Sequence, residues 1–312
     1  MESLYLQQMS NCTICPRKCG ADRSKGKTGV CGVTSEVYVA RAALHFWEEP
    51  CISGSEENGN LNGSGTVFFS GCNLKCVYCQ NYELAHAAYG WEVSIERLSG
   101  IFLDLQKKGA NNINLVTPSQ YIPQIREALL QAKEDGLTIP IVCNCGGYED
   151  PKALRLLDGI VDVYLTDFKY MDAAASARYS GAPDYPERAK EGLEEMLRQC
   201  PEAVFSEDGL MKKGVIVRCL LLPGMVRNTK QVVRYVYETY GEQVWFSLMN
   251  QYTPFDRIKE KYPELSRKAT RREYNALVDY ALDLGITQAF IQEGSAAKDS
   301  FIPEFDGEGV LY

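Results

Sequence analysis

The sequence lacks any apolar run long enough to cross a membrane, and residues 1–8 lack the basic-then-apolar pattern of a secretory signal. Basic residues are also scarce, because 33 Lys and Arg face 41 Asp and Glu and leave a net charge of −8. That balance disfavours non-specific binding to nucleic acid, although it does not exclude a local basic groove on the surface. We therefore expect a soluble, cytoplasmic protein whose partners are neither membranes nor nucleic acids.

Internal repeats and low-complexity tracts are absent as well. The 312 residues, 45% of them hydrophobic, suit one large domain with a small appendage. Cysteine, in contrast, is abundant, with 12 residues. Because disulfides are rare in the cytoplasm, so many thiols indicate metal binding or redox chemistry rather than a disulfide framework.

Three of these cysteines form a compact motif. The run from Ser70 to Asn81 spaces Cys72, Cys76 and Cys79, here called the motif cysteines, as C-x3-C-x2-C. Three thiolates at this spacing suit one 4Fe–4S cluster whose fourth iron has no protein ligand. Structural metal sites normally close every position, so an open iron indicates chemistry at the metal.

Two other interpretations of this motif are compatible with its spacing. The three thiols could form a zinc knuckle with a distant fourth ligand, or pack as small hydrophobic side chains. The context favours the cluster, because residues 66–69 predict a short buried strand that ends at Gly71. The motif cysteines then occupy the loop that leaves a strand, which is where α/β barrels carry their active sites.

A second constellation lies near the N-terminus and consists of Cys12, Cys15, Cys19 and Cys31, here called the N-terminal cysteines. Glycine and charged residues separate them, so the segment cannot fold by apolar burial alone and is predicted to need a metal. Four thiolates suit zinc or a fully ligated Fe–S cluster, and the sequence does not choose between the two. Unligated free thiols are the remaining alternative.

Strand and helix patterns alternate over most of the chain, which predicts a parallel sheet. About six such units fit an open barrel better than a closed eight-stranded one. We therefore predict an α/β fold, with a partial (open) parallel β/α barrel over residues 62–312 and a small N-terminal Cys-rich appendage over residues 1–53. The polar, glycine-rich loop at 54–60 marks the boundary between them.

The individual elements follow from local patterns. Strands are expected at 37–44, 66–69, 112–116, 139–143, 161–166, 214–222, 243–248 and 288–292. Helices are expected at 94–108 and from Ser119 to Gly136. A short helix is expected from Pro151, helical sequence is expected after the strand at 161–166 through Arg198, and further helices are expected to start at Thr229 and Thr270. The last of these begins with a capping box, Thr270 with Glu273.

Polar and charged residues follow several predicted strands: Thr117, Ser119, Asn144, Asp167, Lys169, Arg218 and residues 250–252. Because a parallel barrel brings its strand ends to one mouth, we expect these side chains to lie near the motif cysteines. Asp167 and Lys169 share one face of an extended strand and would bind a charged or hydroxyl-bearing ligand. The alternative is a solvated ion pair.

Four further residues receive simpler interpretations. His45, beside Glu48 and Glu49, is expected to line the site. Cys143 and Cys145 share a strand face and are interpreted as buried small side chains, and Cys51 as an unligated thiol.

The motif cysteines, with the aromatic Tyr78 directly before the third of them, resemble the signature of the radical S-adenosylmethionine (SAM) superfamily. Residues 45–54 and 63–72, together with the N-terminal cysteines, look like the uncharacterised members named pyruvate formate-lyase activating enzyme-like. The resemblance extends over nearly the whole chain. It implies an enzyme in which SAM binds the open iron and one electron from the cluster releases methionine and a 5′-deoxyadenosyl radical.

The resemblance also assigns roles to residues. Tyr78 would position the adenine through its backbone, and the pattern Asp167-Phe168-Lys169 and the basic Arg218 before Pro223-Gly224 match SAM-contacting features of the activating enzyme. Two positions depart from that enzyme. Thr117-Pro118-Ser119 replaces a paired-glycine motif, and Asn144 stands where a carboxylate would help to hold a monovalent cation. The ammonium group of SAM would then be accepted by carbonyls or by the Ser119 hydroxyl.

The resemblance further implies a low-potential electron donor, flavodoxin or ferredoxin, and activation of a glycyl-radical protein. Because of the two departures, radical modification of a small molecule or a peptide is a rival function. A non-enzymatic Fe–S electron carrier or zinc scaffold is a second rival, although such carriers close every iron with cysteine.

Overall fold

The structure is a computed structural model that describes residues 8–57, 59–86, 88–292 and 303–311. Its centre is one sheet with the strand order β10-β9-β8-β6-β5-β4-β2-β1-β3, and β7 pairs separately with β8. The strands are β1 Val37–His45, β2 Ser64–Phe69, β3 Trp91–Val93, β4 Ile113–Val116, β5 Ile141–Cys145, β6 Val163–Asp167, β7 Val204–Phe205, β8 Met211–Leu220, β9 Trp245–Met249 and β10 Ala289–Ile291.

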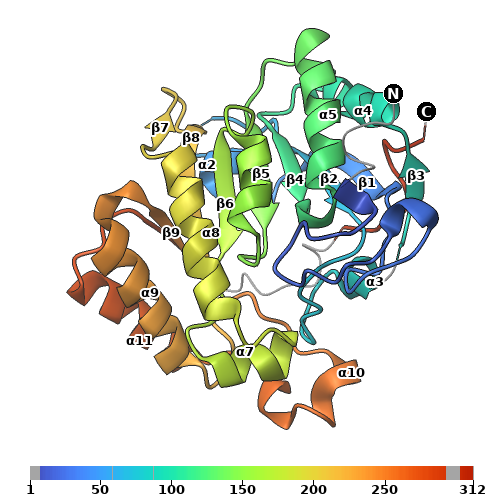
Figure 1. Cartoon of the computed structure of the whole chain (residues 1–312). Coiled ribbons are helices and arrows are strands. Elements are labelled where there is room, and N and C mark those ends of the chain that lie inside the picture. The colour runs from blue at the N-terminus through green and yellow to red at the C-terminus, as the bar shows by residue number, and fades with distance from the viewer. Residues whose placement is uncertain (1–7, 58, 87, 293–302, 312) are drawn as a thin grey trace.

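The helices join these strands and cover the sheet (Figure 1). They are α2 Pro50–Ser53, α3 Tyr82–His86, α4 Ile95–Lys107, α5 Ile122–Glu134, α6 Pro151–Leu154, α7 Ala173–Ser180, α8 Tyr185–Gln199, α9 Val226–Tyr240, α10 Asp256–Lys259 and α11 Arg271–Asp283. Short 3-10 turns occupy Arg23–Lys25, Ser119–Tyr121, Arg155–Leu157, Gly241–Gln243 and Pro263–Leu265. None of the described helices is long and apolar enough to span a membrane.

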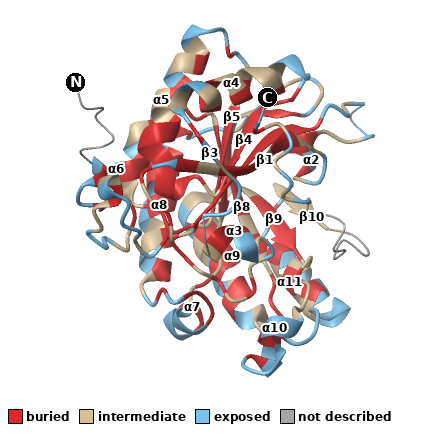
Figure 2. Ribbon diagram, turned by 90° about the vertical axis from the view of Figure 1, so that its right-hand side faces the viewer, coloured by how far each residue is buried: buried red, intermediate tan, exposed pale blue. Residues whose placement is uncertain are grey.

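The seven strands from β2 through β10, leaving out β3 and β7, are mutually parallel. Every residue of β2, β4 and β5 is buried, as expected for strands covered on both faces. Figure 2 shows this buried centre as a red band of strands with α5, α6 and α8 on one side. The open, mostly parallel α/β sheet confirms the predicted fold class.

Local sequence features set the helix ends as predicted. The Ser94 side chain accepts a hydrogen bond from the Arg97 N–H and caps α4. Thr270 and Glu273 form the expected capping box at the start of α11. Gly181, in the left-handed conformation, ends α7, so the helical stretch predicted through Arg198 is two helices rather than one.

One predicted helix start was wrong by one turn. Helix α9 begins at Val226, and Thr229 lies inside its first turn. The Thr229 hydroxyl donates to the carbonyl oxygen of Met225 at 3.2 Å instead of capping the helix. Threonine occurs both at helix N-caps and inside helices, so the residue type alone does not define where the helix begins.

The N-terminal region is joined to the barrel by hydrogen bonds. β1, which lies before the predicted boundary loop at 54–60, pairs antiparallel with β2 and extends the sheet. The buried Arg23 donates to the carbonyl oxygens of Thr34 and Gln120 at 2.6 and 2.8 Å. The described residues up to 53 therefore share backbone and side-chain contacts with the described part of the predicted barrel.

Candidate active site

A cavity of about 240 Å³ opens where the parallel strands end. Nine residues singled out from the sequence line it together: Cys72, Cys76, Tyr78, Cys79, Ser119, Asn144, Asp167, Lys169 and Arg218. They come from the loop after β2 and from the ends of β4, β5, β6 and β8. The topology therefore places these side chains at one mouth, as the alternation of strands and helices predicted.

The loop that carries the motif cysteines has an unusual backbone. Gly71 (φ 81°) and Lys75 (φ 62°) both adopt left-handed conformations. A Cβ at Gly71 would lie 2.9 Å from the carbonyl oxygen of Cys31, so only glycine fits there. Lys75 is not a glycine, so its left-handed conformation is unfavourable by itself. Its ammonium donates to the carbonyl oxygens of Cys31 and Ala85, and these hydrogen bonds hold the conformation.

Burial controls the ionisation of the motif cysteines. It raises the pKa of the Cys76 thiol and raises the pKa of Cys79 to about 12. These thiols would therefore become thiolates only when a metal replaces the proton. In the described part of the chain, no three Cys, His, Asp or Glu side chains gather around one point as a single metal ion would require. Each cysteine of a 4Fe–4S site binds a different iron, so such a site does not require three thiols around one point.

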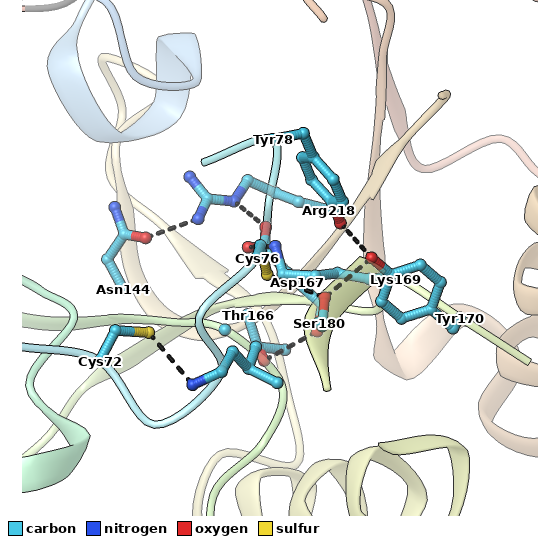
Figure 3. A network of polar contacts seen from close by, with 12 residues as sticks. Cys72, Cys76, Tyr78, Asn144, Thr166, Asp167, Lys169, Tyr170, Ser180 and Arg218 are labelled. Carbon is cyan, nitrogen blue, oxygen red and sulfur yellow. Dashed lines mark hydrogen bonds and ion pairs between the residues drawn. The ribbon is translucent and has the colours of Figure 1, made fainter. Parts of the chain in front are cut away.

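A chain of hydroxyl groups connects this loop to the next elements (Figure 3). The hydroxyls of Tyr78 and Tyr170 lie 2.7 Å apart, and the Tyr170 hydroxyl lies 2.9 Å from Ser180 Oγ. Ser180 Oγ in turn lies 3.0 Å from Cys76 Sγ. All four side chains are buried. The side chain of Tyr78 therefore ties the motif loop to Tyr170, after β6, and to Ser180, in α7.

Asp167 and Lys169 form a buried ion pair and not a solvated one. Their side chains are 19% and 14% exposed, and both line the cavity. Burial opposes ionisation of Asp167, but Arg218 and Lys169 outweigh it and hold the pKa of Asp167 below its ordinary value. Asp167 is therefore an anion at neutral pH, and the partly buried pair lines the cavity.

Arg218 is the centre of a wider network. Its Nε donates to Asp167 Oδ1 at 2.9 Å and its Nη2 donates to Asn144 Oδ1 at 2.6 Å (Figure 3). Its Nη1 lies 3.5 Å from Glu48 Oε2, and Glu48 Oε1 accepts from the amides of Asn114 and Asn144 at 3.3 and 3.2 Å. Arg218 thus joins the ends of β5 and β6 to the segment between β1 and α2.

This network contains more carboxyl groups than cations. Asp167, Glu48 and Glu49 surround Arg218, and only Lys169 adds a second positive charge. Burial raises the pKa of both Glu48 and Glu49, and Glu49 Oε2 has no hydrogen-bond partner among the described residues. The raised pKa values favour the neutral forms of these two carboxyl groups and so reduce the negative charge around Arg218.

Ser119 has a partner that sequence reasoning missed. Its hydroxyl donates to Glu149 Oε1 at 2.7 Å, and the other Glu149 oxygen has no hydrogen-bond partner among the described residues. Burial raises the pKa of Glu149. Position 144 lacks a carboxylate, and Glu149, five residues further on, places a buried carboxyl group behind Ser119 without lining the cavity itself. The sequence signal was an acidic residue two positions after a Gly-Gly pair.

The segment that precedes α2 also reaches the cavity. His45 lines it, as predicted, and so do Glu48 and Trp47. Burial lowers the pKa of His45 to about 4, so its ring is neutral at pH 7. Trp47 is 60% exposed, which leaves a large aromatic side chain at the mouth of the cavity.

The remaining cysteines fall into two groups. Cys51, Cys143 and Cys145 are buried and unpaired, in agreement with their interpretation as small side chains, although Cys145 also touches the cavity. Three of the N-terminal cysteines, Cys12, Cys15 and Cys31, are buried, whereas Cys19 is exposed. These four stand apart from the cavity lining.

Fold and site together define a class of protein. A family model described as the radical SAM superfamily matches residues 66–232, just over half of the chain, from the strand before the motif cysteines into α9. The chain belongs to the radical SAM superfamily, and it is a radical SAM enzyme.

Individual relatives are more distant. An uncharacterised protein of Methanocaldococcus jannaschii, MJ0674, is 27% identical over 288 residues, which cover 88% of this chain and 76% of that protein. Two structures of Streptococcus suis SuiB, bound to S-adenosylmethionine and to its precursor peptide SuiA, are 14% and 12% identical, with TM-scores of 0.49 and 0.48. Each covers 72% of this chain, and the chain spans about half the length of SuiB, 49% and 47%.

Proposed function

We propose that this enzyme cleaves SAM reductively at a 4Fe–4S cluster held by Cys72, Cys76 and Cys79. When bound, the cluster would supply one electron to SAM and release methionine and a 5′-deoxyadenosyl radical. The observation that supports the proposal best is the shared cavity, because the motif cysteines and the charged residues Asp167, Lys169 and Arg218 line it together. Three protein thiolates leave one iron open for a ligand.

The remaining side chains of the cavity would orient SAM. Asp167 and Lys169 present one anion and one cation at the end of β6, which suits the ribose hydroxyls or the charged methionine end. Ser119 offers a hydroxyl for the ammonium group, and Glu149, which accepts a hydrogen bond from that hydroxyl, would orient it. The buried Tyr78, Tyr170 and Ser180 chain would hold the motif loop at a fixed distance from them.

The substrate that best suits the mouth of this cavity is a polypeptide. Trp47 exposes a large aromatic surface at the rim, beside the neutral His45 and the carboxyl of Glu48, and its neighbour in the chain, Phe46, is exposed as well. Exposed aromatic side chains next to a polar cavity are typical of surfaces that bind peptides or proteins. Peptides are therefore the first substrate class to examine for radical modification. A small molecule held within the cavity is the alternative substrate.

Activation of a glycyl-radical protein is the second candidate. The Asp-Phe-Lys pattern at 167–169 and the arginine at 218 are shared with the activating enzyme that the sequence resembles. A glycyl loop is also a polypeptide, so the same aromatic rim would receive it. Flavodoxin or ferredoxin is the electron donor proposed for either function, and the cytoplasm is the proposed location.

The decisive experiment is anaerobic reconstitution with iron and sulfide, reduction with dithionite and quantification of 5′-deoxyadenosine and methionine after addition of SAM. Equal amounts of both products are expected without any substrate, as uncoupled cleavage. Absence of 5′-deoxyadenosine from protein that holds a reduced cluster would contradict the proposal. The substrate class is tested next with Trp47→Ala, which should reduce only substrate-coupled turnover, whereas a glycyl-radical EPR signal on a co-expressed protein would support the second candidate.

A further inference from the structure

The segment that carries the N-terminal cysteines lies against the motif loop and contacts it through Cys31 and Arg17. The backbone N–H of Cys72 donates to the carbonyl oxygen of Cys31 at 3.3 Å, so the first motif cysteine and the last N-terminal cysteine are joined by one hydrogen bond. Lys75, inside the motif loop, donates to the same carbonyl at 3.1 Å. Arg17 donates to the carbonyl oxygens of Asn73 and Leu74 at 2.7 and 3.3 Å.

The four thiols form a group with an inner and an outer side. Cys12, Cys19 and Cys31 are all near enough to Cys15 to act on it electrostatically. Cys31 is buried beside the motif loop, whereas Cys19 is exposed. A Cβ at Gly29 would lie 2.5 Å from Cys19 Sγ, so the glycine keeps space open around this sulfur.

The position of the segment favours one of the two metals that the sequence left open. Cys31 is hydrogen-bonded to Cys72 through its carbonyl oxygen, whereas Cys19 is exposed. Zinc has no redox chemistry, so a zinc ion next to the motif loop could serve only the structure of the segment. An iron–sulfur cluster held by the same four thiolates could take up an electron at the surface and pass it to the motif loop.

We infer that Cys12, Cys15, Cys19 and Cys31 bind a second, fully ligated iron–sulfur cluster that passes electrons to the cluster of the motif loop. A reduced low-potential protein donor would give one electron to the second cluster. The second cluster would then pass that electron to the motif cluster, so the second cluster is oxidised by one electron and the motif cluster is reduced by one. The electron would travel through Cys31 and the hydrogen bond between its carbonyl oxygen and the Cys72 N–H. The relay rests on the proposed function, because SAM cleavage consumes the electron, but the existence of the second cluster does not.

The charge of the segment indicates the kind of donor. Residues 12–31 contain five basic residues and one acidic residue, in a chain whose net charge is −8. Lys18, Lys25 and Lys27 are exposed on the same segment as the exposed Cys19. An acidic electron-transfer protein would dock there, and its association would weaken as salt increases.

The first test separates the clusters by composition. Anaerobically reconstituted wild type should hold about eight iron and eight sulfide ions per chain. Cys15→Ser/Cys19→Ser should hold about four of each, and so should Cys72→Ala/Cys76→Ala/Cys79→Ala, which keeps every N-terminal cysteine. The matched control Cys51→Ser/Cys200→Ser, which also changes two thiols, should stay at about eight. Four irons in wild type and none in the triple variant would overturn the second cluster, as would one zinc ion without additional sulfide.

The second test concerns the relay. With reduced flavodoxin as donor, Cys15→Ser/Cys19→Ser should produce 5′-deoxyadenosine at least about tenfold more slowly than wild type. With titanium(III) citrate, which is small enough to reduce the motif cluster directly, the loss should stay below about twofold. Equal losses with both reductants, or no loss with either, would contradict the relay. If the irons are distributed as expected but wild type forms no 5′-deoxyadenosine with either reductant, the proposed function fails and the second cluster stands.

Discussion

Asp167 and Arg218 are register partners on the adjacent parallel strands β6 and β8, and Arg218 Nε donates to Asp167 Oδ1 at 2.9 Å. The ion pair is buried at the end of both strands, where each side chain also faces the cavity. Because Lys169 and Glu48 touch the same pair, a change at Asp167 alters the charge balance of the whole site.

Replacement of Asp167 by asparagine should weaken SAM binding by about tenfold or more without loss of iron. The Asp167 carboxylate would then no longer balance the cations of Lys169 and Arg218, which would repel the positively charged sulfonium of SAM. EPR or calorimetric titration of the reconstituted variant measures the affinity. Asp306→Asn is the matched control, since Asp306 also pairs with an arginine, Arg41, at 2.8 Å but is 53% exposed. An unchanged affinity in Asp167→Asn would show that the pair does not contact SAM.

Replacement of Cys76 by alanine should remove both the cluster absorbance and the formation of 5′-deoxyadenosine. Cys76 is buried beside Ser180, so no other thiol of the loop takes its place. Cys200→Ser is the control, because Cys200 is equally buried, lies outside the cavity and donates only to the backbone. Undiminished turnover in Cys76→Ala would contradict the assignment of the motif cysteines.

Replacement of Tyr170 by phenylalanine should loosen the motif loop. The change removes the central hydroxyl between Tyr78 and Ser180 and should cost about 1 kcal/mol in the free energy of unfolding. Loss of iron to a chelator under anaerobic conditions should become at least about threefold faster.

Tyr164→Phe provides the comparison for this variant. Tyr164 is also fully buried and donates to Gln199 at 2.6 Å, but Gln199 belongs to α8 and Tyr164 does not line the cavity. Its stability loss should be similar while iron release stays at the wild-type rate. Equal iron release in the two variants would show that the hydroxyl chain does not secure the cluster.

Glu195 should give the protein a specific dependence on acid. Burial opposes its ionisation, but hydrogen bonds from Arg198, Gln199 and Arg155 outweigh burial and lower the pKa of Glu195 to about 2. Because the folded pKa lies below the ordinary value, the carboxylate stabilises the fold above about pH 4.5, and the stabilisation is lost as the pH falls toward 2. Glu195→Gln should therefore lower the free energy of unfolding by about 2 kcal/mol at pH 7.

Denaturant unfolding at pH 7 and pH 3 measures this difference, which should shrink at the lower pH. The exposed neighbour Glu194 is the control, and Glu194→Gln should change the free energy of unfolding by less than about 0.5 kcal/mol at either pH. A difference between wild type and Glu195→Gln that stays constant with pH would contradict the ion-pair explanation.

Local patterns predicted much of this structure. The alternation of strands and helices, the Ser94 cap and the Thr270 capping box each depend on residues a few positions apart, and all of them are present. Helix α9 shows the limit of the method, because Thr229 could either cap a helix or lie within one. The choice depends on how Val232, Val233 and Val236 pack against the sheet, which no short window contains.

The sequence by itself indicated the chemistry, because the order and spacing of Cys72, Cys76 and Cys79, with Tyr78 between them, favour a cluster with an open iron. Only the tertiary structure decided what surrounds that chemistry. Glu48 reaches Arg218 from 170 positions away, Glu149 meets Ser119, and Cys31 contacts Cys72. These relationships arise from strand order and burial, which bring distant residues together and force each buried charge to find a partner.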